Sequence, residues 1–156
     1  MTPSSHFVRF TVPGDPQGKA RPRLGRGGRT YTPDATMRYE RAVAAAARAA
    51  VAGAIRNGLE VDRAGLWRVH ITAFTARPAS RPRDLVAGLW KSGRAVPRRT
   101  KPDADNILKA VLDALNGIVW HDDAQVVSAT VERWMAPVGR LPGVDVLCEV
   151  LSLDGG

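Results

Sequence analysis

Residues 101–127 read KPDADNILKAVLDALNGIVWHDDAQVV, and this stretch predicts both a helix and the strand that follows it. We expect the helix to cover residues 103–116, with Gly117 as its left-handed stop. The strand is expected over residues 125–134. Apolar side chains recur at helical spacing and form one stripe that should face the core. These residues are Ala104, Leu108, Val111 and Leu115.

The flanking sequence supplies the other elements of a small domain. Alternating apolar and polar residues predict strands over residues 6–12, 65–76 and 144–151. A long alanine-rich helix is expected from Thr32, as N-cap before Pro33, to about Asn57. Asp84 is expected to cap one or two helical turns over residues 85–90.

The element order predicts the fold class. Strand, helix, strand, loop, helix and two strands favour an α+β fold, in which one mixed β-sheet carries two main helices. A chain of 156 residues suits one domain, which we expect to span residues 1–156. The beginning of the sequence lacks the features of a signal peptide, so a cytoplasmic location is expected. Cys148 lies in an apolar run and is expected to be a buried structural thiol.

The charge of the chain indicates an anionic partner. The formal net charge is +8, and the excess is concentrated in two loops rich in Pro or Gly, residues 13–31 and 78–102. Such basic segments can follow a phosphate backbone, although an arginine-rich proteome is an alternative source of the charge. The candidate DNA-binding residues are Lys19, Arg21, Arg23, Arg81, Arg83, Lys91, Arg98, Arg99 and Lys101.

Acidic residues gather in the quoted stretch despite the basic surroundings. Asp105, Lys109 and Asp113 lie at i, i+4 and i+8, so they form one row on the predicted helix. Each acid has an ordinary explanation: an N-cap at Asp103, a surface ion pair of Asp105 with Lys109, and a polar turn at 122–123. Their combination on a basic chain favours a bound Mg²⁺ or Mn²⁺ ion, since oxygen ligands suit these metals and no zinc pattern is present.

The same residues resemble a known enzyme family. Asp103-x-Asp105-Asn106-x-x-Lys109-x-x-x-Asp113-Ala-Leu, followed by Trp120-x-Asp122-Asp123-x-Gln125-Val126, is similar to the RusA family of Holliday junction resolvases of bacteria and prophages. Lys19-Ala-Arg-Pro-Arg and Tyr31-Thr-Pro resemble members with a longer basic N-terminal loop. The connection over residues 78–102 is longer than in the shortest members.

The resemblance implies a site and an activity. Asp103, Asp105 and Asp123 are expected to be catalytic carboxylates that bind Mg²⁺, with Lys109 as a catalytic helper and Asp122 as a further candidate ligand. Mn²⁺ is expected to substitute. Asp113 is expected either to be structural or to support the metal-binding residues from behind, and His121 is assigned no chemistry.

The family also implies a homodimer that cuts four-way DNA junctions by paired symmetric nicks in recombination and repair. A junction has approximate two-fold symmetry, and this chain carries one acidic cluster, so two matched cuts need two copies. Two alternatives stay open: a less selective nuclease for flaps, forks or single strands, and a non-catalytic basic DNA-binding module.

Overall fold

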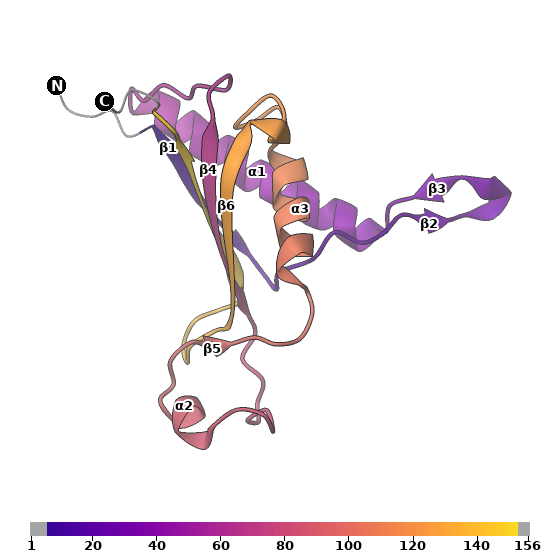
Figure 1. The fold of residues 1–156 in the computed structure, drawn as a ribbon, viewed down its shortest axis with the longest axis vertical. Coiled ribbons are helices and arrows are strands. Elements are labelled where there is room, and N and C mark those ends of the chain that lie inside the picture. The colour runs from indigo at the N-terminus through magenta and orange to yellow at the C-terminus, as the bar shows by residue number, and fades with distance from the viewer. Residues whose placement is uncertain (1–5, 153–156) are drawn as a thin grey trace.

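A mixed β-sheet with helices on one face forms the body of the protein (Figure 1). The computed structural model describes residues 6–152. The sheet has five strands in the order β1-β7-β4-β6-β5, and β4 and β6 are parallel whereas the other pairs are antiparallel. The strands are β1 (Phe7–Pro13), β4 (Trp67–Thr75), β5 (Val96–Pro97), β6 (Val126–Met135) and β7 (Gly143–Val150).

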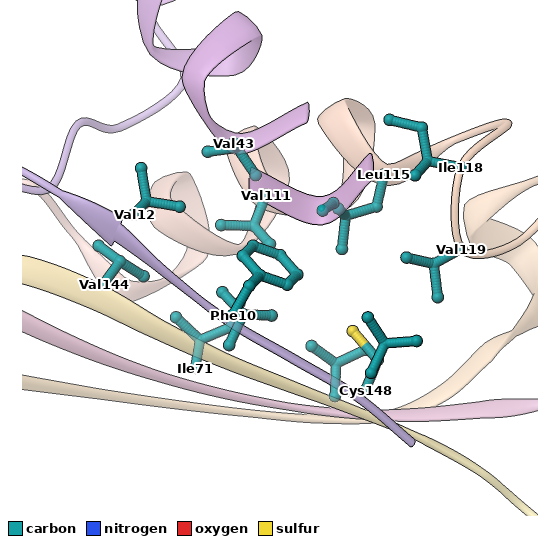
Figure 2. Close-up of a cluster of buried hydrophobic side chains, with 14 of the residues drawn as sticks. Phe10, Val12, Val43, Ile71, Val111, Leu115, Ile118, Val119, Val144 and Cys148 are labelled. Carbon is teal, nitrogen blue, oxygen red and sulfur yellow. The ribbon is translucent and has the colours of Figure 1, made fainter. Parts of the chain in front are cut away.

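Two long helices, α1 (Asp34–Arg56) and α3 (Ala104–Leu115), cover one face of this sheet (Figure 1). Side chains on β1 alternate strictly between exposed and buried, as expected for a strand with only one covered face. Figure 2 shows the resulting core, in which Val43 of α1 and Val111 of α3 meet Phe10 and Ile71 of the sheet. Cys148 is buried in the same cluster, as predicted. The predicted α+β class with a mixed sheet is therefore confirmed.

The long segments between these elements form two projections. Residues 23–31 form a hairpin of β2 (Arg23–Leu24) and β3 (Thr30–Tyr31), joined by the short 3-10 turn η1 (Arg26–Gly28), where the sequence predicts only a loop. Gly27 and Gly28 both have positive φ, which the turn requires. The hairpin extends away from the sheet, and the segment with α2 (Ala87–Lys91) projects from another side (Figure 1). No helix of residues 6–152 is long and apolar enough to span a membrane.

Three local predictions are corrected by the structure. Helix α1 begins at Asp34 after Pro33, whose extended ψ excludes it from the first turn, so Thr32 is not the cap. Asp84 does not cap α2, because the N-cap is Val86 and the Asp84 carboxylate instead lies 3.2 Å from Arg99. The buried stripe of α3 is rotated from the predicted one, since Ala104 and Leu108 are only half-buried. Its buried residues are Ile107, Ala110, Val111 and Leu115.

Candidate functional site

The start of α3 presents two exposed carboxylates. Asp103 is the N-cap residue of α3, but its side chain makes no capping hydrogen bond, so capping does not occupy the carboxylate. Asp105 lies in the first turn, and its Oδ2 is 3.9 Å from Nζ of Lys109. All three side chains are exposed. The backbone that carries them is a rigid helix end, where the helix dipole also stabilises negative charge.

A groove joins this helix end to the N-terminal basic segment. Its volume is about 670 Å³. Residues 16–21 and residues 101–103 line the groove together. They meet there because the chain at Gly18 passes directly over the start of α3. A Cβ added at Gly18 would lie 3.0 Å from Cβ of Asn106, and the Lys19 amide donates to the Asn106 carbonyl at 3.0 Å. The charged residues of the groove are Lys19, Arg21, Lys101 and Asp103.

Lys19 holds this segment against both helices. Its Nζ lies 2.6 Å from Oε1 of Glu40 in α1 and 2.9 Å from Oδ2 of Asp113 in α3. The hydrogen bond to Glu40, more than the one to Asp113, raises the pKa of Lys19 above its usual value, against the opposing effect of burial. The lysine charge is thus already paired within the protein, and Asp113 supplies one of its two partners.

Arg133 of β6 fixes the chain just before Asp103. Its Nη1 donates to the carbonyl oxygens of Thr100 and Pro102, each at 3.1 Å. Arg98 donates from the same region to the Lys101 carbonyl at 2.9 Å. Sequence reasoning missed Arg133, since nothing distinguishes it from the other arginines until the sheet brings it under residues 100–102.

Asp122 and Asp123 occupy the turn that leads from α3 into β6. Asp122 caps the 3-10 turn η2 (Asp123–Gln125), and its Oδ1 accepts from the Ala124 amide at 2.8 Å. Gln125 completes this capping box by accepting from the amides of His121 and Asp122, at 2.9 and 3.0 Å. Its Nε2 donates to the carbonyls of Arg63 and Gly65. The carboxylate of Asp122 is thus engaged in capping η2. Asp123 is half-buried, and its side chain makes no hydrogen bond within residues 6–152.

The two acidic ends lie far apart within one chain. Trp120 packs against the C-terminal end of α3. Its Nε1 donates to Oδ1 of Asn116 at 2.9 Å, and its carbonyl oxygen accepts from the Gly117 amide. Asp123 therefore lies near the end of the 12-residue helix, whereas Asp103 precedes its start. A helix of that length is about 18 Å long. Accordingly, residues 6–152 contain no group of three or more acidic, His or Cys side chains that could hold a metal.

The predicted metal set is thus divided by the structure. Asp103 and Asp105 lie together with Lys109, but Asp123 and Asp122 do not join them in one chain. Two carboxylates still suit Mg²⁺, which commonly binds one or two of them and completes its shell with water and phosphate oxygens. The role of each acid in metal binding stays a prediction.

The other predicted DNA-binding residues line the two projections. Arg21 and Arg23 are exposed at the base of the hairpin, and Arg83, Lys91 and Lys101 are exposed around the segment of α2. Arg81 donates to the Leu85 carbonyl, and Arg99 pairs with Asp84, so both also organise their own loop. Trp90 is covered by the guanidinium of Arg77, which lies 3.9 Å from the ring centroid. Contact of these residues with DNA stays a prediction.

Two comparisons relate the chain to known proteins. A sequence model of the family described as "Endodeoxyribonuclease RusA" matches residues 13–146, which include both acidic ends and both basic projections. The chain is also 28% identical over 147 residues to "Uncharacterized protein YqaN" of Bacillus subtilis (strain 168), and the match covers 93% of this chain and 97% of the Bacillus protein.

Proposed function

Since this chain belongs to the RusA endodeoxyribonuclease family, we propose that it is a Mg²⁺-dependent endonuclease that resolves four-way DNA junctions. One observation carries the proposal furthest: Asp103 and Asp105 lie at a fixed helix end, beside a groove lined by Lys101 and Arg21. A basic groove binds the phosphate backbone, and the carboxylates lie where a bound phosphate would need a cation.

Each residue has a defined task in this proposal. Bound Mg²⁺ would polarise a phosphoryl oxygen and lower the pKa of an attacking water. Asp103 and Asp105 would hold the cation, and the N-terminus of α3 and the backbone anchored by Arg133 keep the two carboxylates in position. Lys109, one turn further along the helix, offsets negative charge that develops on the phosphate. The projecting hairpin and the segment of α2 contact the arms of branched DNA.

Paired assays on a synthetic four-way junction and a matched linear duplex test the proposal. With Mg²⁺, paired nicks confined to the junction are expected. Equal cutting of both substrates would indicate the less selective nuclease instead. Binding without cutting, in Mg²⁺ and in Mn²⁺, would indicate a non-catalytic module.

Asp105→Asn tests the site itself. The substitution removes a cation ligand without changing shape, so junction cutting should fall by at least about 100-fold, which corresponds to about 2.7 kcal/mol of transition-state stabilisation, while junction binding is retained. Asp34→Asn, at an exposed first-turn acid of α1, makes the same change in net charge and should cut normally. Normal cutting by Asp105→Asn would refute the assignment.

A further inference from the structure

The projecting segment that carries α2 contains an apolar pocket (Figure 1). Its volume is about 310 Å³, which lies at the lower end of the range for ligand pockets. Parts of residues 78–89 and residues 97–100 line it together with Met135 of β6. We refer to it as the α2 pocket. Its apolar lining includes Pro82, Leu85, Val86, Leu89, Pro97 and Met135.

Contacts within the chain hold the walls of the α2 pocket in place. Arg77 donates to the carbonyl oxygens of Trp90 and Arg94, at 2.7 and 3.0 Å. Strand β5 joins the segment to β6, and the Gly93 carbonyl accepts from the Val138 amide at 2.8 Å. The pocket is therefore formed before any partner binds.

Two apolar side chains at this pocket are exposed to water. Val86, the N-cap of α2, is 66% exposed, and Leu89 is 51% exposed. None of the five residues of α2 is buried, so the helix contributes nothing to the core of the domain. Exposed apolar side chains around a pocket with a polar rim are typical of a surface that binds a partner.

The rim of the α2 pocket is basic. Residues 77–101 carry eight basic residues against one acidic residue, Asp84. Arg98 and Arg99 both line the pocket. Arg99 lies 3.2 Å from Asp84, but the two side chains are 74% and 55% exposed. Because such an exposed ion pair is weak, a carboxylate of a partner can replace Asp84 at Arg99.

We propose that the α2 pocket binds an acidic segment of a partner protein. A bulky apolar side chain of that segment enters the pocket beside Leu89 and Met135, and the carboxylates next to it pair with Arg98 and Arg99. Apolar anchors in a pocket supply most of the affinity of a protein interface, and opposite charges at the rim guide the approach.

The lining of the α2 pocket favours a peptide over a nucleic acid. Proteins bind unpaired bases chiefly by stacking them on aromatic rings. Among the described residues that line the pocket, none is aromatic. Trp90, on the same segment, is already covered by the guanidinium of Arg77. A phosphate backbone would use the arginines but would leave the apolar side chains uncovered.

A panel of labelled peptides tests the chemistry of the partner. Two central positions carry Leu, Ile, Met, Phe or Val in every combination, and three aspartates flank them on each side. Fluorescence polarisation with the whole protein should find members that bind at least about ten-fold more tightly, or about 1.4 kcal/mol, than the same peptide with two central serines. Replacing the aspartates of those members by serine should weaken binding by a similar factor. If no member exceeds the serine-centred peptide, the proposal is wrong.

Methionine methyl groups report where the best peptide binds. Met135 lines the α2 pocket, whereas Met37 lies on α1 and does not line it. In protein with ¹³C-labelled methionine methyl groups, the peptide should shift the Met135 signal and leave the Met37 signal unchanged. Binding without a change at Met135 would place the peptide on another surface and overturn the proposal.

Matched variants separate the pocket from general charge. Leu89→Ser and Arg99→Gln should each weaken the best peptide at least about ten-fold. Leu141→Ser, at a leucine that is 83% exposed outside the pocket, and Arg41→Gln, on the exposed surface of α1, should bind it normally. All four side chains are exposed, so each variant should retain its circular dichroism spectrum.

Two outcomes of the variant assay would contradict the proposal. Normal binding by both Leu89→Ser and Arg99→Gln would exclude the α2 pocket. A short oligo(dT) that binds more tightly than every peptide, and loses its binding in Leu89→Ser, would assign the pocket to nucleic acid instead. The pocket contains neither Asp103 nor Asp105, and these assays need no metal and no cutting. Their results therefore do not depend on the proposed function.

Discussion

Replacing Lys19 by methionine is expected to weaken the attachment of the N-terminal basic segment to both helices. The substitution keeps most of the side-chain volume but removes the contacts to Glu40 at 2.6 Å and Asp113 at 2.9 Å. It also leaves these two carboxylates without the cation between them. The loss should therefore appear first as reduced stability and not as reduced affinity for DNA.

The size of the expected stability loss follows from the solvent exposure of the three side chains. The side chains of Lys19, Glu40 and Asp113 are 29%, 23% and 41% exposed, so each pair is partly screened by water. Pairs of this kind contribute about 0.2–1 kcal/mol each, and two of them about 0.5–2 kcal/mol. For a chain of this length, that loss lowers Tm by roughly 1–8 °C.

Thermal unfolding followed by circular dichroism measures this loss. The difference in Tm between wild type and Lys19→Met should shrink in 1 M salt, which screens exposed charges, and Lys19→Arg should lose less than Lys19→Met. A double-mutant cycle with Glu40→Gln should give a coupling of about 0.5 kcal/mol or more.

The pH dependence has a definite sign. The pKa of Lys19 is raised in the folded state from 10.5. Its contribution is therefore fully present below pH 10.5 and decreases as the pH rises through the higher folded value. Two results together would refute this structural role. The Tm of Lys19→Met would be unchanged, and the substitution would reduce DNA affinity and its salt dependence as much as Arg21→Ala does. Lys19 would then be a phosphate contact like Arg21, each worth about 0.9 in the slope of log K against log salt.

Two further predictions concern the turn before β6 and the buried thiol. Gln125→Leu removes four hydrogen bonds, two from the amides of His121 and Asp122 and two to the carbonyls of Arg63 and Gly65. We therefore expect a loss of about 1–3 kcal/mol in the free energy of unfolding, measured by chemical denaturation, with slower cutting but normal junction binding. Wild-type stability would show that these hydrogen bonds do not position Asp123. Cys148 is buried, and burial raises the pKa of its thiol to about 12. At pH 8 a disulfide reagent should therefore label Cys148 only as fast as the protein unfolds. Rapid labelling of the folded protein would contradict its burial.

The sequence by itself predicted every main strand and both long helices to within a few residues. Periods of 2 and 3.6 in the apolar residues are local signals, and Gly117 marks the end of α3 within one residue of its place in the structure. The acidic and basic segments were also recognisable, because their residue types carry the chemistry. The exact cap at Pro33 and the rotation of α3 were not predicted, since they depend on what packs against each element.

Only the tertiary structure decided which of these residues meet. The position of β6 in the sheet brings Arg133 to residues 100–102, and the segment before β2 brings Lys19 to both Glu40 and Asp113. No local sequence pattern indicates either contact. Asp103 and Asp123 are separated by 20 positions along the chain, and a straight helix occupies most of that interval, so one chain holds them apart. Spacing in sequence identified the acids as a set, but the rigid length of α3 determines that they do not converge within one chain.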